Sequence, residues 1–366
     1  MNEAQSLMPA FASWSVLTVD FLILLHLTIG GVTLSAILHL ASAKWRYKVR
    51  DIAGSLFALY PLVAVLLVVL LLARHETFAW LGAAAHEGGA GHAEHPLNGW
   101  HSYAFLCARE VLGLLVVGWL YRRFLVLQKV SERSEADWER FKMTANFVPV
   151  AHVLFGTMVA WDFEMTMLPA WESSVYGMYH FVSNFGMFLA TMAVVCHIGN
   201  RRGVWRTPVP EYVLNYFAQM MLAFTILWTY LFFAQYLTIW YGNLPHERNR
   251  IEGMVNGDYG WMWWTFFTMK FAIPFCFLVF TYFRHSPSSI FRIALSIIIG
   301  TWIERYTWIA GSVDVGPFAP AHYPFTSPFD IVVTVLVFGA AFLLVRRQFA
   351  RNELTVAGIA GSTVPT

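Results

Sequence analysis

Long apolar runs separated by short polar segments make up most of the chain. Nine runs are roughly 20 residues long, which is enough for a helix to cross a bilayer. They cover Trp14–Leu40, Ile52–Ala73, Ser102–Tyr121, Thr144–Trp161, Val175–Ile198, Val213–Trp240, Trp261–Phe283, Ile290–Ile309 and Phe329–Val345. The pattern therefore predicts an all-α polytopic membrane protein with about nine transmembrane helices. The first run has no basic segment before it and exceeds the apolar length of a signal peptide, so we interpret it as a span.

Lysine and arginine residues gather in alternate connections. Eighteen lie beside or after the odd-numbered spans, three lie in the other connections, and three lie within spans. The second group is Arg74, Arg248 and Arg250, and the third is Arg109, Lys270 and Arg305. Basic loops stay in the cytoplasm, so we expect the N-terminus outside and the C-terminus inside.

Composition narrows the class of protein. Hydrophobic residues make up 58% and charged residues 13%, too few charges to cover soluble domains. The net charge of +2 and the scattered basic clusters argue against nucleic-acid binding. The three cysteines, Cys107, Cys196 and Cys276, lie in apolar runs without a CxxC pair, which argues against disulfides, an iron–sulfur cluster or covalently attached haem.

Ionisable residues within the predicted spans are costly and are therefore candidates for function. Most carboxylates and all three intramembrane cations fall in the predicted outer half, which indicates a polar chamber open to the outside. Neighbours such as Arg109 and Glu110, or Glu304 and Arg305, point about 100° apart on a helix, so each needs a partner on another helix. The alternative interpretation is that these charges only pair to hold helices together.

The histidines raise the question of haem. Ligands of a transmembrane haem lie at one depth on different helices, and the depths of His26, His39, His180 and His197 do not pair in this way. Hydrogen-bonded histidines or a proton relay are the expected alternative. The spacing His92-x-x-His95 lies in a glycine-rich loop, a weak context for a metal, so we expect no metal site.

Two stretches resemble a known family. Residues 161–179 read W-D-F-E-M-T-M-L-P-A-W-E-S-S-V-Y-G-M-Y, and residues 228–247 read W-T-Y-L-F-F-A-Q-Y-L-T-I-W-Y-G-N-L-P-H-E. They are similar to the NrfD/PsrC-like integral membrane subunits, closest to the ActF-type subunits of bacterial alternative complex III. The matching positions are Asp162, Pro169, Trp171, Ser173, Tyr176, Gly177, Tyr179, Trp240, Tyr241, Asn243, Pro245 and Glu247. Family members have ten spans where nine are predicted here, and Trp302–Tyr306 resembles the sister ActC-type subunits instead.

The resemblance implies two four-helix bundles plus one extra helix. The expected organisation is an outer segment 1–13, a first bundle 14–161, an outer connection 162–174, a second bundle 175–311, a loop with the ninth span 312–351, and a disordered cytoplasmic tail 352–366. The resemblance also implies a bacterial inner (cytoplasmic) membrane location. Partners would be a sister membrane subunit, an iron–sulfur subunit and haem c subunits, which hold the clusters and haems. This chain itself would bind none of these cofactors, and quinol or menaquinol is the one ligand that the resemblance leaves open for it.

The combined expectation is a membrane subunit of a respiratory quinol:cytochrome c oxidoreductase that supports electron transfer from quinol to cytochrome c or an oxidase. No catalytic residue is assigned. Candidate proton acceptors near quinol are Asp162, Asp20, Glu164 and His180. Candidate proton-path residues are His26, Arg109, Glu110, His152, His197, Lys270, Glu304 and Arg305. Asp162 has no basic neighbour in the sequence, which suits a group that takes up and releases protons.

Two alternatives stay open at this point. One is a purely structural anchor for the iron–sulfur and haem c subunits. The other is a secondary transporter, although Pro149 and Pro274 do not form the paired helix breaks typical of that class. Whether quinol binds in this chain or only in a sister subunit also stays open. The connections Asp162–Ser174, Trp240–Gly260 and Asp314–Pro328 are the expected docking surfaces for partners.

Overall fold

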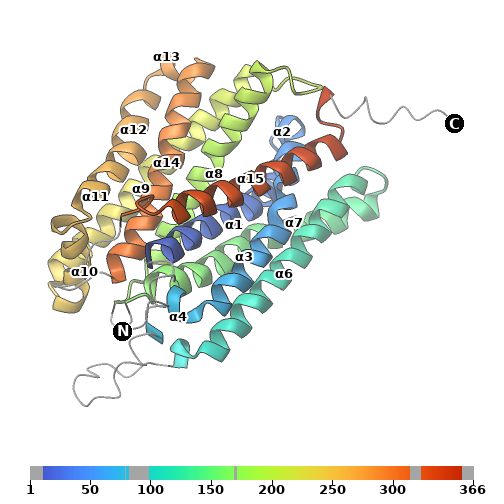
Figure 1. The fold of residues 1–366 in the computed structure, drawn as a ribbon. Coiled ribbons are helices and arrows are strands. Elements are labelled where there is room, and N and C mark those ends of the chain that lie inside the picture. Colours follow the sequence, from blue (N-terminus) through green and yellow to red (C-terminus); the bar gives the residue numbers. More distant parts are fainter. Residues whose placement is uncertain (1–10, 79, 82–98, 169–170, 314–322, 357–366) are drawn as a thin grey trace.

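The computed structural model describes residues 11–78, 80–81, 99–168, 171–313 and 323–356. These residues are helical almost throughout; they contain no named strand, only an isolated bridge between Trp205 and Thr355. The long helices run side by side and alternate in direction (Figure 1). Their bounds are α1 Phe11–Leu40, α2 Arg46–Ser55, η2 Leu56–Leu59, α3 Tyr60–Leu72, α6 Tyr103–Val130, α7 Glu135–Ala160, α8 Tyr176–Arg201, α9 Glu211–Gly242, α11 Gly260–Phe267, η5 Thr268–Ala272, α12 Ile273–Leu278, α14 Pro287–Val313 and α15 Pro328–Arg351.

Short elements complete the chain. They are α4 Arg74–Thr77, η3 Gly99–His101, the π-helical η4 Trp161–Met165, α10 Pro245–Asn256 and α13 Thr281–Arg284. We call the end of the molecule that carries α10 and α4 the α10 end, and the opposite end, with α13 and α2, the α13 end (Figure 1). Because the long helices alternate, the connections rich in Lys and Arg all lie at the α13 end.

The prediction of an all-α polytopic membrane protein is confirmed. Among the described residues, seven helices are long and apolar enough to cross a membrane. The two other predicted spans are also helical, as α11–η5–α12 and α14. They are less apolar because Lys270 lies in the former, and Glu304 and Arg305 lie in the latter.

The long helices pack as two groups of four and one additional helix. The first group is α1, α2–α3, α6 and α7, and the second is α8, α9, α11–α12 and α14. The seam between the groups is made by α1 and α7 against α8 and α14, while α15 lies along α1 and η2. The burial of the helices follows this arrangement. Most residues of α1 are covered by other helices, whereas most residues of α15 are not.

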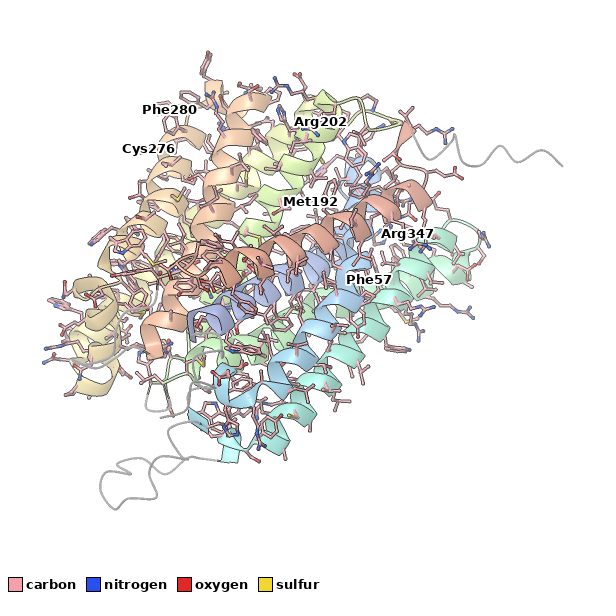
Figure 2. All side chains as sticks on the ribbon, in the orientation of Figure 1. Phe57, Met192, Arg202, Cys276, Phe280 and Arg347 are labelled. Atoms are coloured by element: carbon pink, nitrogen blue, oxygen red, sulfur yellow. The ribbon has the colours of Figure 1, made fainter. Side chains whose placement is uncertain are left out.

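Close backbone approach fixes α1 against α2. A Cβ atom added at Gly31 would come within 2.1 Å of the carbonyl oxygen of Ala53. Small residues at such positions let transmembrane helices pack through dispersion contacts where no hydrophobic driving force acts between them. The outer faces are apolar instead: Cys276 of α12 and Phe280, which follows α12, are exposed, whereas Arg202 and Arg347 lie towards the α13 end (Figure 2).

Three predicted boundaries are corrected. The span predicted to end at Tyr121 continues as the helix α6 to Val130. The span predicted to begin at Thr144 begins at Glu135 as α7, because Ser134 caps it by accepting a hydrogen bond from the Asp137 amide at 3.1 Å. The connection expected to begin at Asp162 instead continues α7 as the π-helix η4.

The predicted disordered tail is also wrong at its start. Residues 352–356 pack back on the molecule, with the Arg206 amide donating to the Leu354 carbonyl at 2.9 Å and the Val356 amide donating to Val204 at 3.0 Å. The remainder of the tail, residues 1–10, the loop with His92 and His95, Pro169, and residues 314–322 lie outside the described residues.

Candidate functional site

Two π-helical turns place charged side chains inside the bundle. The turn η4 carries Asp162 and Glu164, and η5 carries Lys270. A π-turn inserts one residue into a helix, rotates the side chains that follow, and frees backbone carbonyls from their usual partners. Here side chains supply those partners: Thr166 donates to the Asp162 carbonyl at 3.1 Å, and Ser296 donates to the Met269 carbonyl at 2.8 Å.

Arg250 of α10 holds the first π-turn. Its Nη2 donates to the carbonyl oxygen of Glu164 at 2.7 Å, and its guanidinium lies 4.3 Å from the ring centre of Trp171. Burial lowers the pKa of Arg250 to about 10, so the side chain is still charged at neutral pH. Although Arg250 lies in a predicted outer connection, its side chain is fully buried.

A seam cluster forms where the two groups of helices meet. It consists of Glu164, His180, Arg305, His26 and His152, which come from η4, α8, α14, α1 and α7. All five are buried. Glu164 Oε2 receives Arg305 Nη1 at 2.5 Å and lies 2.9 Å from His180 Nδ1. On the other side of its ring, His180 Nε2 lies 2.8 Å from His26 Nε2, and the rings of His26 and His152 stack at 5.8 Å.

The geometry permits two tautomer arrangements. If His180 Nδ1 carries the proton, it donates to Glu164, and His180 Nε2 accepts from His26. If His180 Nδ1 accepts from Arg305 Nη1, at 2.8 Å, then His180 Nε2 donates to His26. Switching between the two arrangements moves the shared proton between His26 Nε2 and His180 Nε2, so the pair can pass a proton.

The prediction that these histidines do not pair across helices is wrong for His26 and His180. The two residues lie on different helices at the same depth, since their Nε2 atoms are in direct contact. This contact leaves no room for a metal atom between the two nitrogens. Among the described residues, no three His, Cys, Asp or Glu side chains are arranged to hold a metal ion.

A second cluster, the Lys270 cluster, lies in the second group of helices. It contains Lys270, Glu304, Ser183, Tyr179 and Trp228. Glu304 accepts hydrogen bonds from Lys270 and Tyr179, from Ser183 at 2.6 Å and from Trp228 Nε1 at 2.9 Å. We predicted that Glu304 and Arg305 each need a partner on another helix, and this is confirmed. Lys270 pairs with Glu304, and Glu164 pairs with Arg305.

Arg305 joins the two clusters. Its Nη2 lies 3.1 Å from Glu304 Oε1, while its Nη1 binds Glu164. At the other end, His152 Nδ1 lies 2.9 Å from the Thr33 hydroxyl, which lies 3.1 Å from the Tyr121 hydroxyl. A row of polar contacts therefore runs from Lys270 through Arg305 and the seam cluster to His26. The stacking of His26 on His152 transfers no proton, so it separates this row from the contacts of His152, Thr33 and Tyr121.

Asp162 belongs to a separate Asp162 cluster. Both carboxylate oxygens are bound by Arg109, through Nε and Nη2 at 2.6 Å each, and Trp100 Nε1 donates at 2.7 Å. Asp162 has no basic neighbour in the sequence, but Arg109 of α6 supplies one in space. Glu110 is buried beside this pair, and neither of its oxygens has a hydrogen bond of ordinary geometry to the described residues.

The remaining candidates lie apart from these clusters. Asp20 accepts a hydrogen bond from Trp302 Nε1 at 2.9 Å, on the side of α1 that faces α14. His197 stacks on Phe291 near the α13 end, and His39 contacts Trp138 and Phe141. None of the three is bonded to the seam cluster by a described contact.

A cavity of about 370 Å³ opens at the α10 end beside the Asp162 cluster. We call it the tryptophan pocket; its lining is Trp100, His101, Trp161, Met165, Thr166, Trp171, Glu172, Ser173 and Ser174. Burial, reinforced by the charge of Arg109, lowers the pKa of His101 below its usual 6.5. The imidazole is therefore neutral at pH 7 and is able to accept a proton.

The two family-like stretches differ in what they build. In the first, Tyr176 donates to Glu164 at 2.6 Å, Tyr179 donates to Glu304, and Ser173 lines the tryptophan pocket. Gly177 lets α8 approach α7, since a Cβ there would lie 2.5 Å from Thr157. In the second, the residues form the α9–α10 turn at the α10 end: exposed Trp240 and Tyr241, Asn243 with a φ of 49°, Pro245 opening α10, and Glu247 in its first turn.

Several members of these clusters were not among the residues predicted from the sequence. Ser183, Trp228, Thr33 and Tyr121 carry no signal in the sequence, because hydroxyl and indole groups are common in membrane helices. Their roles depend on which helices become neighbours. No family model and no curated protein matches the chain.

Proposed function

We propose that this chain is a membrane subunit of a respiratory quinol-oxidising complex, in which it moves protons released near the α10 end into the membrane interior. The observation that carries the proposal is the buried series Glu164, His180 and His26, in which each side chain contacts the next, while Arg305 stays charged and holds Glu164. Ionisable groups inside a membrane are expensive to keep, and such rows are typical of proton relays.

The tryptophan pocket is the proposed quinol site. Its volume suits a ring-sized headgroup, and its indole rings offer stacking surfaces. Oxidation of a quinol to a quinone releases two protons and two electrons. His101 is placed to accept a proton from a ring hydroxyl. The electrons would leave to iron–sulfur and haem c groups held by partner subunits docked at the α10 end, which in this proposal faces outward.

The test compares two histidines of α8 in the intact complex. Replacing His180 by Gln removes the imidazole ring that contacts Glu164 on one side and His26 on the other. Replacing His197 by Gln changes a histidine of the same helix that lies outside the row. We expect H180Q to slow quinol-driven proton release about tenfold, corresponding to about 1.4 kcal/mol in the barrier, with H197Q near wild type. Equal rates for both variants in assembled complexes would refute the relay.

A structural anchor is the second candidate function. The bidentate pair of Arg109 and Asp162 favours it, because both groups are neutralised by each other and join α6 to η4. An anchor predicts that H180Q changes assembly and thermal stability but leaves the proton release per electron unchanged. The same experiment therefore separates the two functions.

A further inference from the structure

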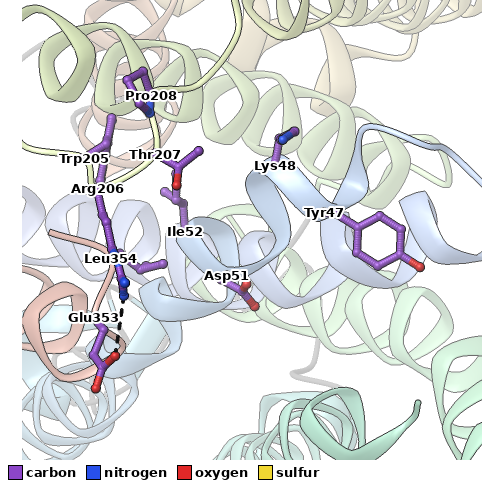
Figure 3. A pocket seen from close by; sticks show the side chains of 10 residues that line it. All are labelled: Tyr47, Lys48, Asp51, Ile52, Trp205, Arg206, Thr207, Pro208, Glu353 and Leu354. Atoms are coloured by element: carbon purple, nitrogen blue, oxygen red, sulfur yellow. Dashed lines mark ion pairs between the residues drawn. The ribbon is translucent and has the colours of Figure 1, made fainter.

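A second cavity, of about 280 Å³, lies at the α13 end, opposite to the tryptophan pocket. Figure 3 shows the side chains that line it. The cavity opens between α2, the segment 205–208 and the residues that follow α15. Its lining is Tyr47, Lys48, Asp51, Ile52, Trp205, Arg206, Thr207, Pro208, Glu353 and Leu354. No step of the proposed proton route uses this cavity.

The walls of this cavity are held by specific contacts. Asn200 fixes the segment before α9 by bonding the Val209 amide at 2.9 Å and the Val209 carbonyl at 2.7 Å. The Trp205 ring packs on Phe349 of α15, at 5.2 Å between ring centres. Backbone hydrogen bonds from Arg206 and to Val204 then hold the chain after α15. The cavity is therefore pre-formed, which lowers the entropic cost of binding a ligand.

The charges in the lining are balanced. Lys48 and Arg206 supply two cations, and Asp51 and Glu353 supply two carboxylates. Arg206 and Glu353 are 3.8 Å apart, with 58% and 68% of their side chains exposed, so this contact is loose (Figure 3). Asp51 has a similarly long contact, 3.8 Å to Arg50. Arg206, Glu353 and Asp51 are thus able to exchange these partners for a ligand.

The surroundings match the interface between water and lipid. Exposed Tyr47 lies under Arg46 and Arg50, at 4.5 and 4.7 Å from its ring centre, and aromatic and basic residues of this kind mark membrane interfaces. Beside the cavity, Val204 and Val356 expose apolar side chains. A ligand with a charged head and apolar chains fits this position.

We propose that this cavity binds the headgroup of a zwitterionic aminophospholipid. The phosphate lies between Lys48 and Arg206 and accepts from the Thr207 hydroxyl, and the primary ammonium donates to Asp51 and Glu353. Basic pockets at helix ends attract lipid phosphates in general. The two carboxylates oppose a purely anionic headgroup and favour one that also carries an ammonium group.

The test measures which phospholipids stay bound to the full chain. The protein is reconstituted in vesicles of phosphatidylcholine alone, or with added phosphatidylethanolamine or phosphatidylglycerol, then re-extracted, and the retained lipid is measured by mass spectrometry. We expect selective retention of phosphatidylethanolamine, and about tenfold less in K48Q and R206Q. The control K44Q, an exposed lysine outside the lining, retains as much as wild type.

Asp51→Asn separates the two halves of the headgroup. It removes a carboxylate that accepts from a primary ammonium, so we expect the preference for phosphatidylethanolamine over phosphatidylcholine to disappear while both still bind. Retention of phosphatidylglycerol above phosphatidylethanolamine, or equal retention by wild type and K48Q, overturns the proposal. Release of the lipid by inorganic phosphate alone, but not by phosphoethanolamine, also overturns it, since the cavity is then a simple phosphate site.

Discussion

Individual buried charges in this protein differ in how completely they are paired. Asp162 has both oxygens bound by Arg109, whereas Glu164 shares one oxygen between Arg305, His180 and Tyr176 and leaves Oε1 without a hydrogen bond to the described residues. A fully paired carboxylate resists a change of protonation, while a partly paired one near a histidine allows it. We therefore propose proton transfer at Glu164 and a structural role at Asp162.

Replacing Asp162 by Asn tests this assignment. Asparagine cannot form the bidentate ion pair, so the buried Arg109 loses its counter-charge. Breaking a buried pair on one side costs about 3–5 kcal/mol, and we expect a clearly lower thermal unfolding temperature in detergent. Combining Arg109→Met with Asp162→Leu removes both charges and should recover much of the loss. If D162N keeps its unfolding temperature and loses turnover tenfold, Asp162 handles protons.

His101 predicts a pH dependence. Burial lowers its pKa below 6.5, so its folded state binds fewer protons than its unfolded state as the pH falls towards and below 6.5. Stability contributed by neutral His101 is thus present above pH 6.5 and is lost on acidification. In the complex, the acid limb of the quinol oxidation rate should lie below pH 6.5 and vanish in His101→Gln. An acid limb above pH 6.5 would exclude His101 as the acceptor.

At the scale of helices, irregular turns decide where the polar groups meet. Two π-turns interrupt otherwise regular helices, and they contain Asp162 and Glu164 in η4 and Lys270 in η5. Close approaches at glycines then bring neighbouring helices near enough for side chains to bond. A Cβ at Gly300 of α14, for example, would lie 2.8 Å from Lys270 Cγ.

A matched pair of glycine substitutions tests the packing. In Gly31→Ala the new methyl group meets the Ala53 carbonyl oxygen, and the backbone cannot move aside cheaply. We expect a loss of about 1–3 kcal/mol, the usual cost of overpacking. Gly339→Ala on α15 meets nothing within 4 Å, so it should be neutral or stabilise by about 0.5–1 kcal/mol. Similar unfolding temperatures for both variants would refute the close approach.

At the scale of the whole molecule, the two ends differ in charge. The α13 end carries the basic connections, and the α10 end carries the tryptophan pocket. By the positive-inside rule, we propose that the α13 end faces the cytoplasm. The same orientation puts the proposed lipid cavity in the inner leaflet and the proposed quinol site near the outer surface.

Cysteine labelling tests this orientation. In a background without Cys107, Cys196 and Cys276, a cysteine at Ser134 lies in the α6–α7 turn, and one at Glu252 lies exposed on α10. A membrane-impermeant maleimide added to intact cells should label E252C and leave S134C unlabelled until the cells are opened. Labelling of both from one side would contradict the alternating arrangement of the helices.

The sequence by itself determined the all-α polytopic class and most helix positions. Runs of apolar residues have one stable solution in a bilayer, a helix that satisfies its own backbone hydrogen bonds. It also identified the ionisable residues at membrane depth, since few charges occur there. Because Arg109 and Glu110 are adjacent on a helix and point in different directions, the sequence also predicted partners on other helices. Asp162 is the partner of Arg109.

Only the tertiary structure decided which of those residues meet. His26 and His180 are 154 positions apart, and their contact depends on how α1 and α8 pack and on the rotation of each helix. The π-turns at Asp162 and Lys270 follow from neighbouring side chains that satisfy freed carbonyls, which no local pattern in the sequence shows. Arg250 looked like a loop charge because its burial against Trp171 comes from the way α10 folds back over η4.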